Sequence, residues 1–284
     1  MSPMKSISLW PIVVKTTSPG KPPIEKDKTS HMLRNISILT CFITLSLAAC
    51  NRSDKKNIRD FYFPLKQLKE GTVYAYESLQ NDSLIDTTYW YYRSFISDSA
   101  IFLTGTYYGS FPEPQQFVRE EMVRNGMLLN DMYLYVSDST GKQQPISTTI
   151  LSGSVFPFEV SDSGGVFLYK VQFAFPTNST DTITLIKNRR YLGDTTYTVQ
   201  NELAQAVVFD LRELIESGNS QQGYVEPRYG GKEIYAKGKG LVYSEKQVNA
   251  ELKLANRLVF TCTMEALEDI FKKKYPQAMM KKPD

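Results

Sequence analysis

The strongest structural signal in this chain comes from Thr72-Val73-Tyr74-Ala75-Tyr76-Glu77 and Thr87-Thr88-Tyr89-Trp90-Tyr91-Tyr92. Both runs are rich in β-branched and aromatic residues, which are enriched in strands. Between them lies Gln80-Asn81-Asp82-Ser83, a cluster of residue types that favour turns. The two runs are therefore predicted to form a β-hairpin.

Strand-like segments continue along most of the chain after this hairpin. They are Ala100 to Tyr108, Phe117 to Arg124, Met127 to Val136, Val166 to Phe175, Thr182 to Tyr191, Thr195 to Gln200, Ala206 to Leu211, Lys232 to Tyr243 and Leu252 to Thr263. Asn125-Gly126 is the clearest tight turn, because this pair accepts the positive φ angles of a two-residue hairpin loop. Helical patterns do not alternate with the strands, so βαβ architectures are disfavoured. The pattern predicts a mainly β fold with an antiparallel, meandering sheet.

Only the C-terminal end is typical of a helix. Thr263 can cap a helix from Met264 to Lys274, in which Leu267, Ile270 and Phe271 share one face. Pro276 follows and stops it. A short helix is therefore predicted after the last strand.

Two other segments are less regular. Phe61 to Lys69 is interpreted as a packed lead-in of one or two helical turns, closed by Gly71. Glu202 to Ser217 suits either a helix or a strand. The alternation of Val207, Phe209 and Leu211 favours a strand through Leu211, followed by a short turn.

The N-terminal region carries the marks of an export signal. Arg34 supplies a positive charge, residues 36–47 form an apolar core, and Leu47-Ala48-Ala49-Cys50 sets small residues before a cysteine. A spanning helix needs roughly 20 apolar residues, and this core is much shorter. The boundary resembles the lipobox of bacterial lipoproteins, which implies cleavage before Cys50 and its acylation. The alternative is a cysteine that merely ends a cleaved or buried apolar segment.

The lipobox divides the chain into four parts. Residues 1–31 precede Met32 and look wrong for an export signal, so they are interpreted as an extension from a misassigned start or as a disordered leader. Residues 32–49 are the predicted signal peptide. Residues 50–60 are predicted to be a lipidated, flexible tether, because they are polar and charged. Residues 61–284 are predicted to form one β-rich domain, large enough to bury its own core.

Cleavage before Cys50 changes what the composition implies. The full chain of 284 residues has a formal net charge of +3, but the segment before Cys50 is basic and holds the only histidine, His31. The remaining chain is close to neutral and shows no nucleic-acid footprint. Without histidine it cannot use a Ser-His-Asp or Cys-His mechanism, and it lacks the commonest zinc ligand. No cofactor, metal or nucleic-acid partner is predicted.

Carboxylate catalysis is the enzymatic route that stays open. The local carboxylate groups are Glu120 with Glu121, Glu213 with Glu216, and Glu265 with Glu268 and Asp269. Neighbours along a strand point to opposite faces, so Glu120 and Glu121 cannot share a site directly. The other groups fall on expected solvent faces. Cys262, the one thiol that remains once Cys50 is acylated, alternates with apolar residues and is interpreted as a core residue. A non-enzymatic protein is predicted.

The aromatic residues suggest a binding face. Alternation places Phe167, Tyr169, Phe173 and Phe175 on one side of their strand, and Trp90 and Tyr92 on one side of theirs. A sheet that curls around such a face leaves a groove for an apolar or amphipathic, lipid-like ligand. The alternative is an aromatic core covered by the C-terminal helix.

The order of elements resembles the LolA/LolB-like superfamily of periplasmic lipoprotein carriers and acceptors. The likeness rests on Gly71-Thr72-Val73-Tyr74-Ala75-Tyr76 and on Glu233-Ile234-Tyr235-Ala236-Lys237-Gly238-Lys239-Gly240-Leu241-Val242-Tyr243. It implies a curved antiparallel half-barrel of about ten strands, with the two glycines admitting a bend in the last segment. The predicted location of the lipid-anchored protein is the outer membrane, facing the periplasm, with the cell surface as an alternative.

Two classes of function follow. The first is a lipid-anchored β-protein whose concave aromatic face binds an apolar ligand. The second is a structural or interaction lipoprotein that docks a protein partner through a sheet edge or loops.

Overall fold

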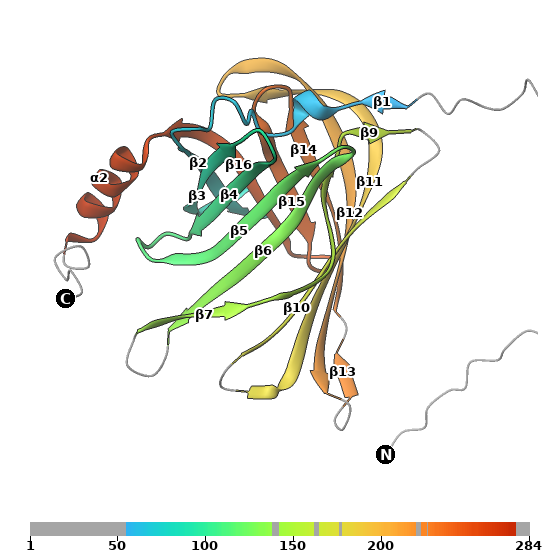
Figure 1. Cartoon of the computed structure of the whole chain (residues 1–284). Helices are drawn as coiled ribbons and strands as arrows, with labels where there is room; N and C mark the ends of the chain where they lie inside the picture. Colours follow the sequence, from blue (N-terminus) through green and yellow to red (C-terminus); the bar gives the residue numbers. More distant parts are fainter. Residues whose placement is uncertain are drawn as a thin grey trace, which may run out of the picture. The chain divides into compact units, whose positions relative to one another are not determined.

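The computed structural model describes residues 55–137, 142–161, 165–175, 178–219, 223–225 and 227–276 (Figure 1). The strands are β1 (Lys56–Asn57), β2 (Thr72–Gln80), β3 (Ser83–Ile96), β4 (Ile101–Tyr108), β5 (Pro114–Val123), β6 (Gly126–Ser137), β7 (Gln143–Ser147), β8 (Thr149–Pro157), β9 (Glu159–Val160), β10 (Val166–Phe175), β11 (Asn178–Val199), β12 (Glu202–Asn219), β13 (Gly223–Val225), β14 (Arg228–Ala236), β15 (Gly240–Gln247) and β16 (Lys253–Cys262). The helices are the 3-10 helix η1 (Arg59–Phe61) and α2 (Met264–Lys274).

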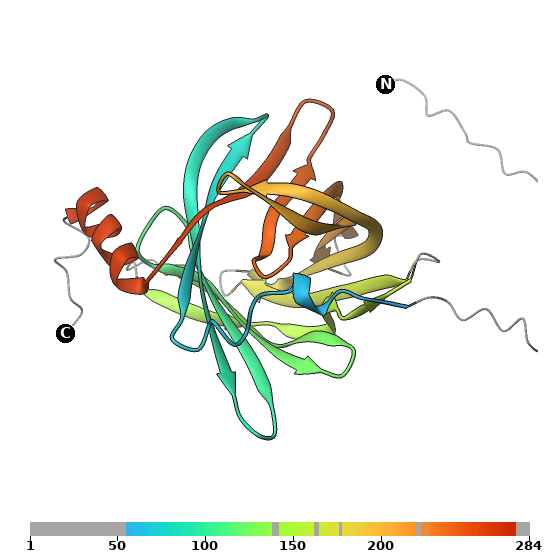
Figure 2. The same cartoon turned by 90° about the horizontal axis from the view of Figure 1, so that it is seen from above.

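Twelve strands pair side by side in a closed ring. The order is β2, β3, β4, β5, β6, β8, β10, β11, β12, β14, β15 and β16, which pairs back with β2. Each of these pairings is antiparallel, so the chain runs up and down around the ring. Figure 2 shows the strands surrounding a common interior, with α2 outside it. The predicted mainly β, antiparallel fold class is confirmed. The pairing of β11 with β12 closes the sheet into a ring, so it is barrel-like and not an open half-barrel.

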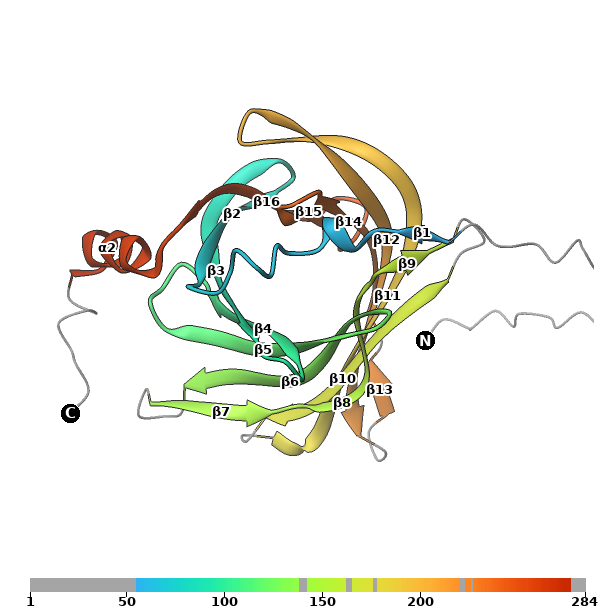
Figure 3. The ribbon, with the colours of Figure 1, turned by 45° about the horizontal axis from the view of Figure 1, so that its top comes forward.

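The up-and-down order gives the ring two ends. One end carries the β3–β4, β5–β6, β11–β12 and β14–β15 turns, and the other carries the β2–β3, β4–β5 and β15–β16 turns. The first end is crossed by residues 56–70, which we call the stopper segment (Figure 3). We call this the stoppered end and the opposite one the distal end.

Backbone hydrogen bonds hold the stopper segment in place. Ile58 N donates to Phe158 O at 2.8 Å, Gly238 N donates to Asp60 O at 2.8 Å, and Ser94 N donates to Leu68 O at 2.9 Å. β1 pairs with β9, and Ile58 is fully buried. Residues 50–54 of the expected tether lie outside the described residues, and from Lys56 onward the chain is packed into the domain.

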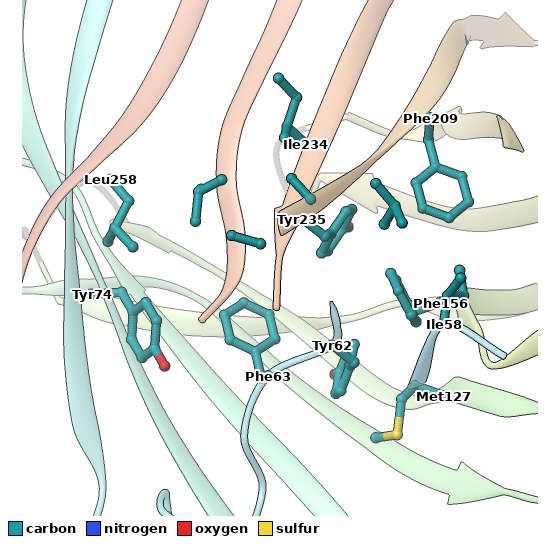
Figure 4. Close-up of a cluster of buried hydrophobic side chains, with 14 of the residues drawn as sticks. Ile58, Tyr62, Phe63, Tyr74, Met127, Phe156, Phe209, Ile234, Tyr235 and Leu258 are labelled. Carbon is teal, nitrogen blue, oxygen red and sulfur yellow. The ribbon is translucent and has the colours of Figure 1, made fainter. Parts of the chain in front are cut away.

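An aromatic core fills the space beneath the stopper segment (Figure 4). Tyr62 and Phe63 of the stopper segment lie against Phe156 and Tyr92 of the sheet, with ring centroids 5.3 Å and 4.3 Å apart. Phe156 in turn lies 4.8 Å from the Tyr235 ring. Buried aromatic side chains of this size dominate core energetics, so the stopper segment is part of the core.

The predicted C-terminal helix is confirmed with its cap. Ala266 N donates to Thr263 Oγ1 at 3.3 Å, and α2 spans the predicted residues. Leu267 and Phe271 are buried against Val73, Ala75 and Tyr89, on the outer face of β2 and β3. α2 therefore covers the outside of the sheet. Within the described residues, no helix has the length and apolar content needed to cross a membrane.

Several strand boundaries differ from the sequence prediction. β12 continues to Asn219 where a turn was expected after Leu211, and β7 and β8 had not been predicted. The single bent strand expected from Lys232 to Tyr243 is the hairpin of β14 and β15. Lys239 N donates to Ala236 O at 3.0 Å across this turn, and Gly238 has a φ of +70°. These are features of a type II turn, which favours glycine at its third position.

Candidate functional site

A cavity of about 230 Å³ lies inside the ring on the distal side of the aromatic core. Its lining residues come from β2, β3, β4, β5, β15 and β16, and they are Tyr76, Thr88, Trp90, Tyr107, Gln116, Leu241, Ser244 and Asn256. All eight are uncharged, and most carry a hydroxyl or amide group beside an aromatic surface. This mixture suits a small amphipathic ligand.

Ring packing and hydrogen bonding hold the cavity wall. Trp90 stacks on Tyr92 with centroids 5.5 Å apart and planes 5° apart, and Tyr107 lies 5.1 Å from Trp90. Trp90 and Tyr107 are cross-strand partners on β3 and β4, which places both side chains on the same face of the sheet, and both line the cavity. Tyr76 Oη donates to Leu241 O at 2.9 Å. The wall is therefore preorganised.

The predicted ligand-binding residues occupy different places. Trp90 lines the cavity, whereas Tyr92 is buried in the aromatic core. Phe167 packs against that core, and Tyr169 packs with Trp90 against the buried cluster of Val118, Leu129, Met132 and Val171. Phe173 is partly buried on β10, and the Phe175 side chain lies outside the described residues. Their role in ligand binding stays a prediction.

A network of buried charges lies on the wall formed by β11, β12, β14 and β15. Arg189 Nε donates to Glu233 Oε2 at 2.6 Å, and Lys187 Nζ lies 3.5 Å from Glu233 and 3.1 Å from Glu213. Lys246 pairs with the other side of Glu213. Burial opposes ionisation of Glu233, but the charges of Arg189 and Lys187 outweigh it and hold its pKa at about 2. These carboxylates therefore stay charged inside the sheet.

Arg189 is not fully satisfied by this network. Its side chain is buried, and its Nη1 atom has no hydrogen-bond partner among the described residues. A buried donor without a partner carries a desolvation cost. Arg189 therefore depends strongly on Glu233 for its compensation.

Glu120 connects the stopper segment to the sheet. The Tyr62 hydroxyl donates to the Glu120 carboxylate, and both side chains are buried. Burial raises the Glu120 pKa to about 7, against the opposing effects of the Tyr62 hydrogen bond and the Arg189 charge. This carboxyl therefore changes its charge near neutral pH. Glu121, its neighbour, is outside the interior, as alternation predicts.

Sequence reasoning missed most of the cavity. Alternation from Trp90 reaches Thr88 on the same strand, but Gln116, Ser244 and Asn256 come from strands far away in the chain. Only the closure of the ring brings them together.

The sequence matches no family model and no curated protein. A structure from Parabacteroides distasonis, described as a candidate lipoprotein, has a TM-score of 0.43 and 11% identity, covering 71% of this chain and 98% of its own. A candidate exported protein with a YmcC-like fold from Bacteroides fragilis has a TM-score of 0.44 and 12% identity, covering 72% and 99%. The hypothetical lipoprotein YmcC from Escherichia coli has a TM-score of 0.27 and 8% identity, covering 84% and 100%. The LolA/LolB-like resemblance stays a prediction.

Proposed function

We propose that this protein is a lipid-anchored protein of the cell envelope that binds a small amphipathic ligand in its distal cavity without catalysing a reaction. The anchor is acylated Cys50, and the observation that supports it is the Leu47-Ala48-Ala49-Cys50 boundary. The observation that supports binding is the cavity itself, in which Trp90 and Tyr107 lie beside amide and hydroxyl groups. Attachment to the outer membrane on its periplasmic side belongs to the same proposal.

The size of the cavity narrows the ligand class. Sites for drug-sized ligands usually have volumes of about 300 to 1,000 Å³, and this cavity has about 230 Å³. A whole phospholipid is therefore too large. The polar end of an uncharged amphiphile is the better candidate, because its hydroxyl groups would meet Gln116, Ser244 and Asn256.

Replacing Cys50 by serine should abolish acylation and release the protein from the membrane fraction. The reason is that the Cys50 thiol forms the thioether to the lipid in the proposed anchor, so the variant has no thiol to which the lipid can be attached. Metabolic labelling with a palmitate analogue and membrane fractionation measure both effects. Cys262→Ser is the matched control and should keep its label. Undiminished label in Cys50→Ser would refute the anchor.

A short-chain monoacylglycerol should change the emission of Trp90 in a saturable way. The chain has two tryptophans, and Trp10 lies before the cleavage site, so Trp90 reports alone in the processed protein. Gln116→Leu should weaken binding of the probe about fivefold, because it removes hydrogen-bonding partners worth roughly 1 kcal/mol. Gln205→Leu, an exposed change at the stoppered end, should leave binding unchanged.

Native mass spectrometry of the processed protein completes this test. A bound adduct of amphiphile mass is expected after gentle release from the membrane. A protein that carries no adduct and shows no saturable change of Trp90 emission would refute ligand binding. The protein would then fit the structural or interaction class.

A further inference from the structure

The stoppered end lies where the chain enters the domain. β1, which pairs with β9, begins at Lys56 and is the first part of the stopper segment. Cys50 precedes Lys56 by six residues, and a chain of this length spans at most about 20 Å. If Cys50 is acylated as proposed, the stoppered end therefore stays close to the bilayer surface.

Exposed cations gather at this end. Several basic residues there are already neutralised, since Lys55, Lys56, Lys237 and Lys239 pair with Glu159, Asp194, Asp60 and Glu202. Others are exposed and pair with no carboxylate among the described residues: Arg59, Lys66, Lys69, Arg93 and Arg124. Glu70, Asp98 and Glu265, which lies in the first turn of α2 just after β16, are exposed carboxylates at this end without a cationic partner in the described chain. The unpaired charge at the stoppered end is therefore mainly positive.

Apolar side chains project at the same end. Phe95 and Ile96, at the end of β3, are 47% and 39% exposed. Leu203, beside the β11–β12 turn, is 73% exposed. Backbone hydrogen bonds connect both regions to the stopper segment. Next to Phe95, Ser94 N donates to Leu68 O. Near Leu203, Gln205 O accepts from Lys237 N, and the adjacent Gly238 N donates to Asp60 O. Exposed apolar tips among cations are typical of surfaces that meet anionic membranes.

One of these contacts shows how charge and apolar surface combine. The Arg93 guanidinium lies over the Phe95 ring at 5.2 Å, and Arg93 Nε donates to Lys69 O at 3.2 Å. The guanidinium is thereby held beside the apolar tip and keeps other donors free for phosphate oxygens. A lipid phosphate and the adjoining acyl region are the groups that this arrangement fits.

We propose that the stoppered end is a membrane-docking surface, which places Phe95, Ile96 and Leu203 among the headgroups of an anionic bilayer. Arg59, Lys66, Lys69, Arg93 and Arg124 then lie near the lipid phosphates. The inference rests on the proposed anchor at Cys50, and it adds an orientation. The distal cavity faces away from the membrane to which the protein is attached.

Tryptophan placed at each end tests this orientation in the full processed lipoprotein. Leu203→Trp reports the stoppered end, and Leu84→Trp is the matched control because Leu84 is 60% exposed at the distal β2–β3 turn. Each variant is reconstituted into vesicles of phosphatidylcholine and phosphatidylglycerol with brominated chains. Subtracting the emission of the parent protein removes the signal of Trp90.

The emission of Leu203→Trp should be quenched at least twofold more than that of Leu84→Trp. Adding Lys66→Glu and Lys69→Glu should remove most of this difference, as should omitting phosphatidylglycerol. Equal quenching at both ends, or stronger quenching of Leu84→Trp, would overturn the docking surface. The mass of the protein in the same samples separates the two proposals. An acylated Cys50 without selective quenching would support the anchor and refute the docking surface. An unmodified Cys50 would refute both.

Discussion

Replacing Glu233 by alanine should lower the free energy of unfolding by about 3 to 5 kcal/mol, which is the range for removing one partner of a buried ion pair. Glu233 accepts from Arg189 Nε at 2.6 Å and from Tyr235 Oη at 3.1 Å inside the sheet. Without it, the Arg189 guanidinium stays buried with no carboxylate in contact, and its Nη1 atom already lacks a partner. Lys187 would still be compensated by Glu213.

Urea denaturation of the chain that begins at Asn51 measures this effect. The double variant Arg189→Met with Glu233→Leu should recover much of the loss, because replacing both charges by apolar groups of similar volume removes the uncompensated charge. Arg212→Ala is the matched control on the outer face, where Arg212 pairs with Asp210 at 3.6 Å and its side chain is 81% exposed. It should change stability by less than about 1 kcal/mol. A Glu233→Ala midpoint equal to that of this control would contradict the assigned burial.

Local signals were sufficient to predict the elements whose pattern is complete within a short window. The β2–β3 hairpin follows from two dense runs of β-formers around Asn81 and Asp82, which indeed adopt positive φ angles of 48° and 65°. α2 follows from the Thr263 cap and the apolar face of Leu267 and Phe271. In both cases the information lies in neighbouring residues, so no knowledge of the tertiary fold is needed.

The second half of β12 shows why other elements were missed. The alternation of Val207, Phe209 and Leu211 predicts a strand that ends at Leu211 and is followed by a short turn, and Glu213 with Glu216 is expected on a solvent face. In the structure Glu213 faces inward, where Lys187 of β11 and Lys246 of β15 neutralise it. Lys187 lies across the long β11–β12 hairpin from Glu213, and Lys246 is on β15, two strands further along the chain. An analysis of hydrophobic alternation assigns charged residues to the solvent face, so it cannot detect a charged residue on an inner face.

The cavity, too, could not be predicted in full, because it forms only when the ring of strands closes. Alternation placed Trp90 on a concave face, and the structure places it in the cavity wall. Tyr92, on the same face, was expected to line a groove but is covered by Phe63 of the stopper segment, with ring centroids 4.3 Å apart. The sequence of residues 61–69 indicates a segment that packs against the domain. It does not show that they cross the end of the sheet.

Replacing Gly240 by valine should destabilise the domain by about 3 kcal/mol or more, because two costs combine at this residue. Gly240 has a φ of +83°, which β-branched side chains rarely adopt. A Cβ atom there would also lie 2.4 Å from Cδ1 of Phe63, so the stopper segment would have to move. The close approach of the Phe63 ring, together with the positive φ, explains why this position, predicted as a bend in one strand, requires a residue without a side chain.

Two other glycines separate these costs in the same denaturation experiment. Gly238 has a φ of +70° with nothing within 4 Å of an added Cβ, so Gly238→Val should show the backbone cost alone, about 1 to 3 kcal/mol. Gly230 has neither a positive φ nor a close neighbour, so Gly230→Val should leave the midpoint unchanged or raise it, since valine favours strands. If Gly240→Val is no more destabilising than Gly238→Val, then Phe63 does not press on Gly240, and the stopper segment is held by its hydrogen bonds instead of by this contact.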